Sequence, residues 1–175
     1  MTYKITQIQT TIDDHRIAKL AAIAIALHMV EAVIPSPIPG VKPGLANIVT
    51  LYVLYEYGFA ATAWVSILRV FASSLLLGQF LSPTFALSLS GAVLSLAALW
   101  LAQHLPKQWF GPITLSILAA FAHIGGQLLL VRLWLIPHAG VIYLIPVFAA
   151  AALVFGLING IITAKLLCNK PKSSV

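Results

Sequence analysis

The chain has 175 residues, of which 61% are hydrophobic and only 8% charged, and its mean hydropathy is +1.01. This composition excludes an ordinary soluble domain, because too few polar residues are available to cover its surface, and it predicts an integral membrane protein. The net charge of +6 comes mainly from basic residues near the two ends of the chain, so we do not interpret it as a nucleic-acid-binding surface.

Six apolar segments follow one another along the chain, each close to the roughly 20 residues that a helix needs to cross a bilayer core of about 30 Å. The second is short, so it is expected to be tilted, broken or partly re-entrant. None alternates apolar and polar residues as barrel strands do, which predicts an all-α polytopic membrane protein. The segments run from His15 to Ile34, Gly44 to Tyr57, Phe59 to Leu77, Pro83 to His104, Gly111 to Ile136 and Val141 to Leu167.

The positions of lysine and arginine predict the orientation, because short loops rich in these residues stay in the cytoplasm. Basic residues gather at both ends of the chain, so six crossings place both termini inside and leave Lys42 as the basic residue of an outer loop. We therefore divide the chain into a polar cytoplasmic tail (1–14), a single six-helix transmembrane domain (15–168) and a basic cytoplasmic tail (169–175).

Charged and amide side chains inside the apolar segments are the candidate site residues. At a rise of about 1.5 Å per residue, Glu31 and Asn47 fall in the outer half of the membrane and Arg69 near its middle. Ionisable groups at such depths are costly unless they are paired or face a cavity, so each is a functional candidate. Together they predict a polar, substrate-binding pocket that opens outward. The set is Glu31, Lys42, Asn47, Arg69, His123 and Gln127.

The link between the first two segments, PSPIPGVKPG, is rich in residues that restrict or turn the backbone. It is predicted to form a semi-rigid flap that carries Lys42 over the pocket, although a plain connector would also fit. Gly44 then lets the chain turn into a helix whose N-terminal amides favour an anionic group. Two other assignments stay open: Glu31 could pair with Arg69 to hold the helices together, and His123 could be a core histidine.

Several kinds of chemistry are not indicated. Cys168 is the only cysteine, which excludes intramolecular disulfides and cysteine metal clusters. The chain carries no nucleotide-binding loop, so an ATP-driven step would need another subunit. Prenyl diphosphate synthesis needs aspartate-rich DDxxD motifs to hold magnesium, whereas this chain has only Asp13 and Asp14. We therefore predict no cofactor, no metal site and no catalytic residues.

Four stretches resemble the bacterial family of heptaprenyl diphosphate synthase component I, also called the Gx transporter family. The longest is PIPGVKPGLANIVTLYVL (37–54), preceded by Glu31; Pro43 and Ile124 depart from the usual pattern. The family is similar to the S components of energy-coupling-factor transporters, which have six helices, cytoplasmic termini and a ligand site beneath the first outer loop. The resemblance implies the bacterial inner membrane. The other stretches are LRVFASSLLLGQFL (68–81), LSLSGAVLSL (87–96) and AHIGGQLLL (122–130).

The resemblance also implies a docking surface on the first helix, where Ala18, Ala22 and Ala26 form a small-xxx-small stripe. S components use such a stripe to bind a transmembrane coupling subunit, which works with ATPases. Packing within the chain is the alternative for these alanines.

Three functions follow from the sequence. The first is a membrane solute-binding or uptake protein for an anionic small molecule, isoprenoid-like or quinone-precursor-like, that enters from outside. The second is a non-catalytic membrane component that accompanies a soluble prenyl synthase. The third is a structural membrane partner without a ligand. The expected partners are therefore the bilayer, the anionic ligand, and either a coupling subunit with ATPases or the synthase.

Overall fold

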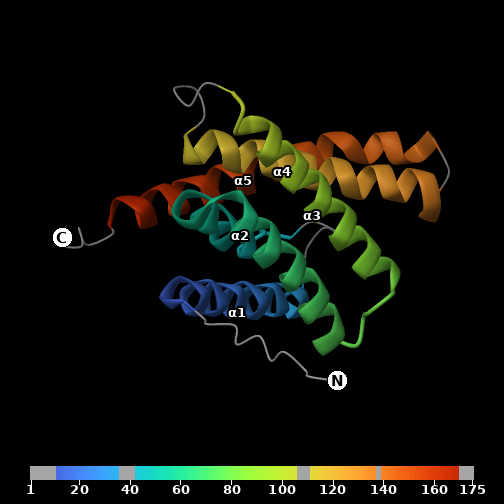
Figure 1. Cartoon of the computed structure of the whole chain (residues 1–175). Helices are drawn as coiled ribbons and strands as arrows, with labels where there is room; N and C mark the ends of the chain where they lie inside the picture. The colour runs from blue at the N-terminus through green and yellow to red at the C-terminus, as the bar shows by residue number, and fades with distance from the viewer. Residues whose placement is uncertain (1–10, 36–41, 106–110, 137–138, 170–175) are drawn as a thin grey trace, which may run out of the picture.

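The computed structural model describes residues 11–35, 42–105, 111–136 and 139–169, and the secondary structure of these residues is entirely helical (Figure 1). The all-α prediction is therefore confirmed for the described part of the chain. The flap residues 36–41 and most of both predicted tails lie outside it. The elements are α1 (Ile12–Val33), α2 (Ala46–Leu76), α3 (Pro83–Ala102), α4 (Pro112–Leu130), η1 (Val131–Leu135), η2 (Ala139–Leu144) and α5 (Ile145–Cys168).

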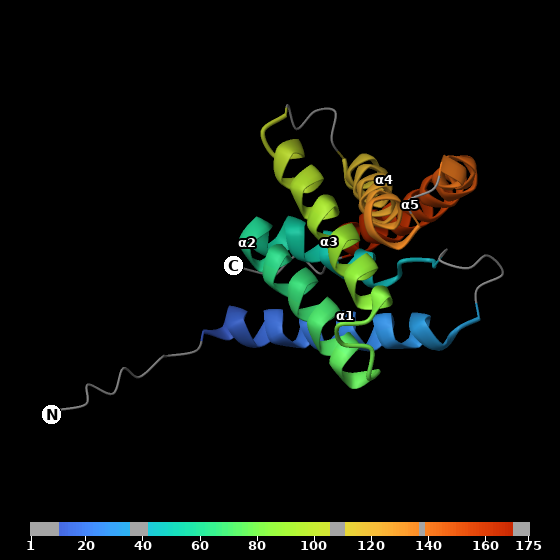
Figure 2. The same cartoon turned by 90° about the vertical axis from the view of Figure 1, so that its right-hand side faces the viewer.

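Helix α2 contains both the second and the third predicted segments, joined by a sharp bend at Gly58. The φ and ψ of Gly58 are 79° and −177°, a combination that is essentially restricted to glycine. The hydroxyl of Thr62 donates to the Gly58 carbonyl at 2.8 Å, which adds a side-chain hydrogen bond at the bend. The two halves consequently run in different directions (Figure 2). The short second segment is thus a separate half-helix that starts at Ala46.

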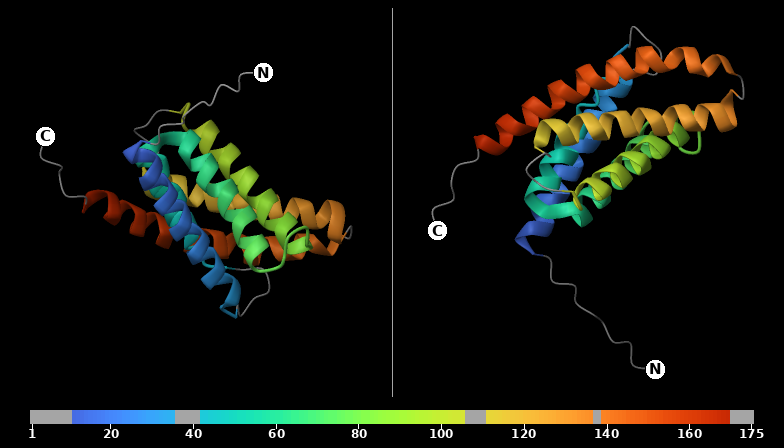
Figure 3. Two further views of the ribbon diagram at one scale, coloured as in Figure 1. Left: turned by 60° about the horizontal axis from the view of Figure 1, so that its bottom comes forward. Right: turned by 90° about the horizontal axis from the view of Figure 1, so that it is seen from above.

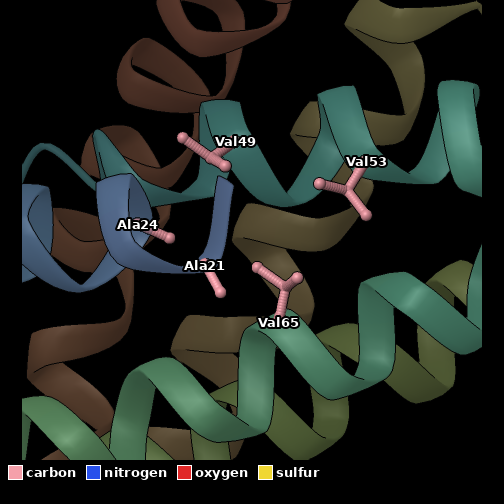
Figure 4. Close-up of a cluster of buried hydrophobic side chains, with 5 residues drawn as sticks. All are labelled: Ala21, Ala24, Val49, Val53 and Val65. Carbon is pink, nitrogen blue, oxygen red and sulfur yellow. The ribbon is translucent and has the colours of Figure 1, made fainter. Parts of the chain in front are cut away.

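Helix α1 packs against both halves of α2. Its contact face carries Ala21 and Ala24, which meet Val49 and Val53 from the first half of α2 and Val65 from the second half (Figure 4). All five side chains are buried. Small alanines let the helices approach closely, and the valines fill the space between the two halves. The cluster therefore fixes the angle of the V that α2 forms.

The first turn of α1 is fixed by a capping box. The hydroxyl of Thr11 accepts from the backbone N–H of Asp14, and the Asp14 carboxylate accepts from the backbone N–H of Thr11. These hydrogen bonds from Thr11 lower the pKa of the exposed Asp14 carboxyl below its ordinary value of 3.8. Asp13 lies 3.7 Å from Arg16 in a surface ion pair. The two aspartates are therefore engaged in starting a helix.

Helices α3, α4 and α5 pack side by side, and α4 and α5 run along one another for most of their length (Figure 3). Glycine allows the backbones to approach. A Cβ on Gly126 of α4 would lie 2.6 Å from the Ser90 carbonyl of α3, and a Cβ on Gly160 of α5 would lie 2.7 Å from the Cα of Ile113. Substituents at either glycine would push neighbouring helices apart.

Four helical stretches among the described residues are long and apolar enough to cross a membrane: Ala46–Leu76, Pro83–Ala102, Pro112–Leu135 and Gly140–Cys168. The chain is therefore a multi-pass membrane protein. Helix α1 is not among the four, because it carries five charged side chains: Asp13, Asp14, Arg16, Lys19 and Glu31. The number of six crossings and the cytoplasmic location of the termini stay predictions.

Candidate functional site

A cavity of about 440 Å³ lies between the helices, and all five α-helices contribute to its lining. This volume is within the range of about 300–1,000 Å³ that is typical of small-molecule sites. The six predicted side chains come from segments far apart in the sequence, and the fold brings every one of them to this cavity. They are Glu31, Lys42, Asn47, Arg69, His123 and Gln127.

Glu31 connects the end of α1 to the start of α2. Its carboxylate is only 3% exposed and accepts a short hydrogen bond from the backbone N–H of Leu45, the residue just before α2. It thus lies at the positive end of the α2 dipole. The sequence predicts an anionic ligand group at this helix end, whereas in the structure the protein's own carboxylate takes that position.

Arg69 lies on the second half of α2 and is also only 3% exposed. Its Nη1 donates to the Oδ1 atom of Asn47 at 3.1 Å, whereas its Nε–H has no hydrogen-bond partner among the described residues. Glu31 attracts Arg69 electrostatically, but the pair is not within the 4 Å of a salt bridge. The alternative of a direct Glu31–Arg69 ion pair is therefore wrong for this structure. Arg69 keeps donors available within a cavity wall.

The segment 42–45, which carries Lys42 and leads into α2, is held by α5. The side-chain amide of Asn159 donates to the carbonyls of Pro43 and Gly44 at 3.0 and 3.1 Å. Gly44 has a φ of 70°, a left-handed conformation that other residues adopt at a cost. Asn159 lies 14 residues after the start of α5, or about 21 Å along its axis, so the first turn of α2 lies level with the middle of α5.

His123 and Gln127 lie on α4 as a pair one turn apart, and their side chains touch: Nε2 of Gln127 is 3.2 Å from Nε2 of His123. The His123 ring packs against Gly91 of α3, where an added Cβ would lie 2.7 Å from the ring. Because Gly91 has no side chain, the His123 imidazole can occupy this space and reach the cavity. His123 thus belongs to the lining, and its contact with a ligand stays a prediction.

Seven further polar side chains line the cavity besides the six predicted ones: His28, Ser73, Ser74, Gln79, Thr84, Ser88 and Asn159. Asn159 is buried on the very apolar helix α5. A polar amide within an apolar segment needs a partner, and this signal, which selected Gln127, applies equally to Asn159. His28 lies one turn before Glu31 and also reaches the lining. Its spacing of three residues from Glu31 is the signal that places both on one face.

Beyond these polar groups, the lining that α4, η1 and α5 contribute is apolar, whereas α2 and α3 contribute the hydroxyl groups of Ser73, Ser74, Thr84 and Ser88. On α5, Phe148, Ala152 and Phe155 share one face with Asn159. Residues 148 and 159 are separated by about 16 Å along the helix axis. Leu128, Val131 and Leu135 continue the apolar lining along α4 into η1. The cavity thus has apolar walls along α4 and α5, and hydroxyl groups from α2 and α3 elsewhere in its lining.

Comparison with known proteins adds one match. The family model described as heptaprenyl diphosphate synthase component I matches residues 20–166. The chain belongs to this family. No curated protein and no solved structure matches the chain. Every side chain named above as lining the cavity lies within residues 20–166. The cavity is therefore built entirely from the part of the chain that matches the family model.

Proposed function

We propose that this member of the family binds an anionic small molecule in the cavity and takes part in its uptake from the outer side of the membrane. The single observation that carries the proposal is Arg69, a buried cation in a cavity wall whose Nε–H has no partner among the described residues. A charge buried in this way is costly unless an anion or a set of hydrogen bonds satisfies it.

The surroundings of Arg69 support a ligand as the missing partner. Asn47 offers only a neutral amide oxygen, and Glu31 is engaged with the start of α2. Lys42, which precedes the two residues whose carbonyls Asn159 holds, adds a second cation to the lining. Two cations that face one cavity attract an anion and strengthen its binding at low local dielectric.

The proposal is tested by native mass spectrometry of the protein ejected from lipid nanodiscs. The parent protein is expected to retain one anionic molecule per chain, and Arg69→Gln is expected to lose it. Arg132→Gln is the matched control, because Arg132 is exposed and lies outside the lining. Lys42→Ala is expected to weaken retention, with Lys19→Ala as its control. Equal retention by Arg69→Gln and the parent would contradict the proposal.

Uptake also needs a partner, and we propose that a transmembrane coupling subunit docks on the stripe Ala18, Ala22 and Ala26. All three alanines are exposed on α1, whereas Ala21 and Ala24 make the internal contacts. This exposure supports docking over packing within the chain, which is the alternative for the stripe. Ala22→Leu is expected to abolish co-purification of the subunit, and Ala150→Leu, at an exposed alanine of α5, is expected to retain it. An intact complex with Ala22→Leu would refute the docking surface.

A second candidate function follows from the family description, which names a component of a prenyl diphosphate synthase. In this role the protein would accompany a soluble synthase at the membrane and exchange a lipid-like anion with it. The two functions differ in their partner. Affinity purification from native membranes that yields a soluble synthase and no coupling subunit would favour the accessory role over uptake.

A further inference from the structure

The geometry points to a more specific ligand than an anion in general. We propose that the solute carries a single negative charge, on a carboxylate, and an elongated apolar body that lies along α4 and α5. This inference rests on the proposed function, since it names the substrate class of the same cavity.

The charge of the lining sets the charge of the ligand. The described lining residues include the cations Lys42 and Arg69 and the carboxylate of Glu31. With His28 and His123 counted as neutral, the formal sum is +2 − 1 = +1. One monoanion brings the whole cavity to zero. A second negative charge on the ligand would be left uncompensated in an apolar surrounding, where an unpaired charge is expensive.

The donors on Arg69 favour a planar anion. A guanidinium presents its N–H groups in a fixed plane that matches the two oxygens of a carboxylate. Nη1 of Arg69 already holds Asn47, and the Nε–H on the same planar group has no partner among the described residues. A carboxylate that meets this edge of Arg69 accepts from the Nε–H with one oxygen and from a terminal N–H with the other, which is a two-point contact.

The apolar walls set the form of the rest of the ligand. From Asn159 the α5 wall continues through Phe155 and Ala152 to Phe148, about 16 Å along the helix. Leu128 and Val131 of the α4 and η1 lining are apolar as well. A body that buries hydrocarbon or an aromatic ring here contributes about 25 cal/mol for every Å² removed from water. A small ion such as acetate lacks that contribution.

A matched ligand series tests the inference in nanodiscs at pH 8, with empty nanodiscs correcting for partition into lipid. The probes are phenylhexanoate, phenylhexanamide, phenylhexyl phosphate and acetate, and the readout is the change in tryptophan fluorescence. Phenylhexanoate is expected to bind at least about tenfold more tightly than each of the others. At this pH the phosphate monoester is a dianion, because its second pKa is about 6.

Phosphate binding as tight as carboxylate binding would overturn the single charge, and acetate binding as tight as phenylhexanoate binding would overturn the apolar body. Both results leave the proposed function intact, since an anion still binds. If no probe binds and no anion is retained in native mass spectrometry, the proposed function fails together with this inference.

The charge count itself is tested by Glu31→Gln. Glutamine keeps an oxygen that accepts the Leu45 N–H, while the sum of lining charges rises from +1 to +2. The preference for carboxylate over phosphate is expected to fall by about tenfold or to reverse. Asp13→Asn, which removes a carboxylate from the exposed end of α1, is expected to leave the preference unchanged. An unchanged preference in Glu31→Gln would contradict the count, and the wild-type series remains decisive if this variant does not fold.

Discussion

Replacing Asn159 with leucine removes both hydrogen bonds that tie the 42–45 segment to α5, at nearly constant side-chain volume. The bonds run from one amide nitrogen to the carbonyls of Pro43 and Gly44 at 3.0 and 3.1 Å. A typical hydrogen bond contributes about 1 kcal/mol net, so two contribute about 2 kcal/mol to the closed state of this segment. Local opening should then rise by about 30-fold.

Hydrogen–deuterium exchange of peptides that cover residues 42–50 measures this opening directly. Asn159→Leu is expected to raise their exchange about 30-fold, while peptides from α3 exchange as in the parent. Thr163→Val is the matched control, because Thr163 is fully buried one turn further along α5 and its hydroxyl bonds only the Asn159 carbonyl. An increase below about threefold, or an equal increase in the control, would refute the anchoring of the 42–45 segment by Asn159.

Three further substitutions test other parts of the structure. Gly91→Ala places a Cβ 2.7 Å from the His123 ring. We expect it to lower the free energy of unfolding by about 1–3 kcal/mol, measured by thermal unfolding, and to weaken anion retention. Unchanged retention would show that binding does not depend on the position of the imidazole. Gly58→Ala is expected to cost about 1–3 kcal/mol through strain at φ 79°, whereas Gly125→Ala, on regular helix with open space around its Cβ, should be close to neutral; equal stabilities would contradict the bend. Because folding lowers the pKa of Asp14, its carboxylate stabilises α1 at pH values above the ordinary pKa of 3.8, and this stabilisation is lost as the pH falls through the folded pKa. The opening of the first turn of α1, measured by amide exchange, should increase over that pH range. In Asp14→Asn the opening should not depend on pH there.

Hydropathy alone located the helices to within a few residues, because lipid demands that each long apolar run satisfies its own backbone. The segment from Pro83 became α3 with the same first residue, and the break expected near Gly58 became the bend in α2. The same reasoning gathered the six polar side chains at one cavity, since each had to avoid lipid. In a regular helix each residue adds a fixed rise, so the sequence gives the depth of a side chain in the membrane.

Hydrogen-bond partners could not be read in this way. Glu31 was expected to face a ligand or Arg69, yet it accepts from the Leu45 N–H, because the chain returns to the end of α1 only through the turn at Gly44. The contacts of Asn159 with Pro43 and Gly44 join residues more than 110 positions apart. Such pairings depend on how α5 packs against the start of α2, and packing of apolar helices leaves little trace in their composition.

The central claim is that Arg69, Lys42 and their polar neighbours surround a cavity that holds one anionic molecule. Structure determination of the protein extracted in native lipid tests this most directly. We expect separate, non-protein density that begins beside Arg69 and extends toward Phe148. Side chains of α4 and α5 packed solidly through this space, with Arg69 satisfied by protein groups alone, would contradict the account.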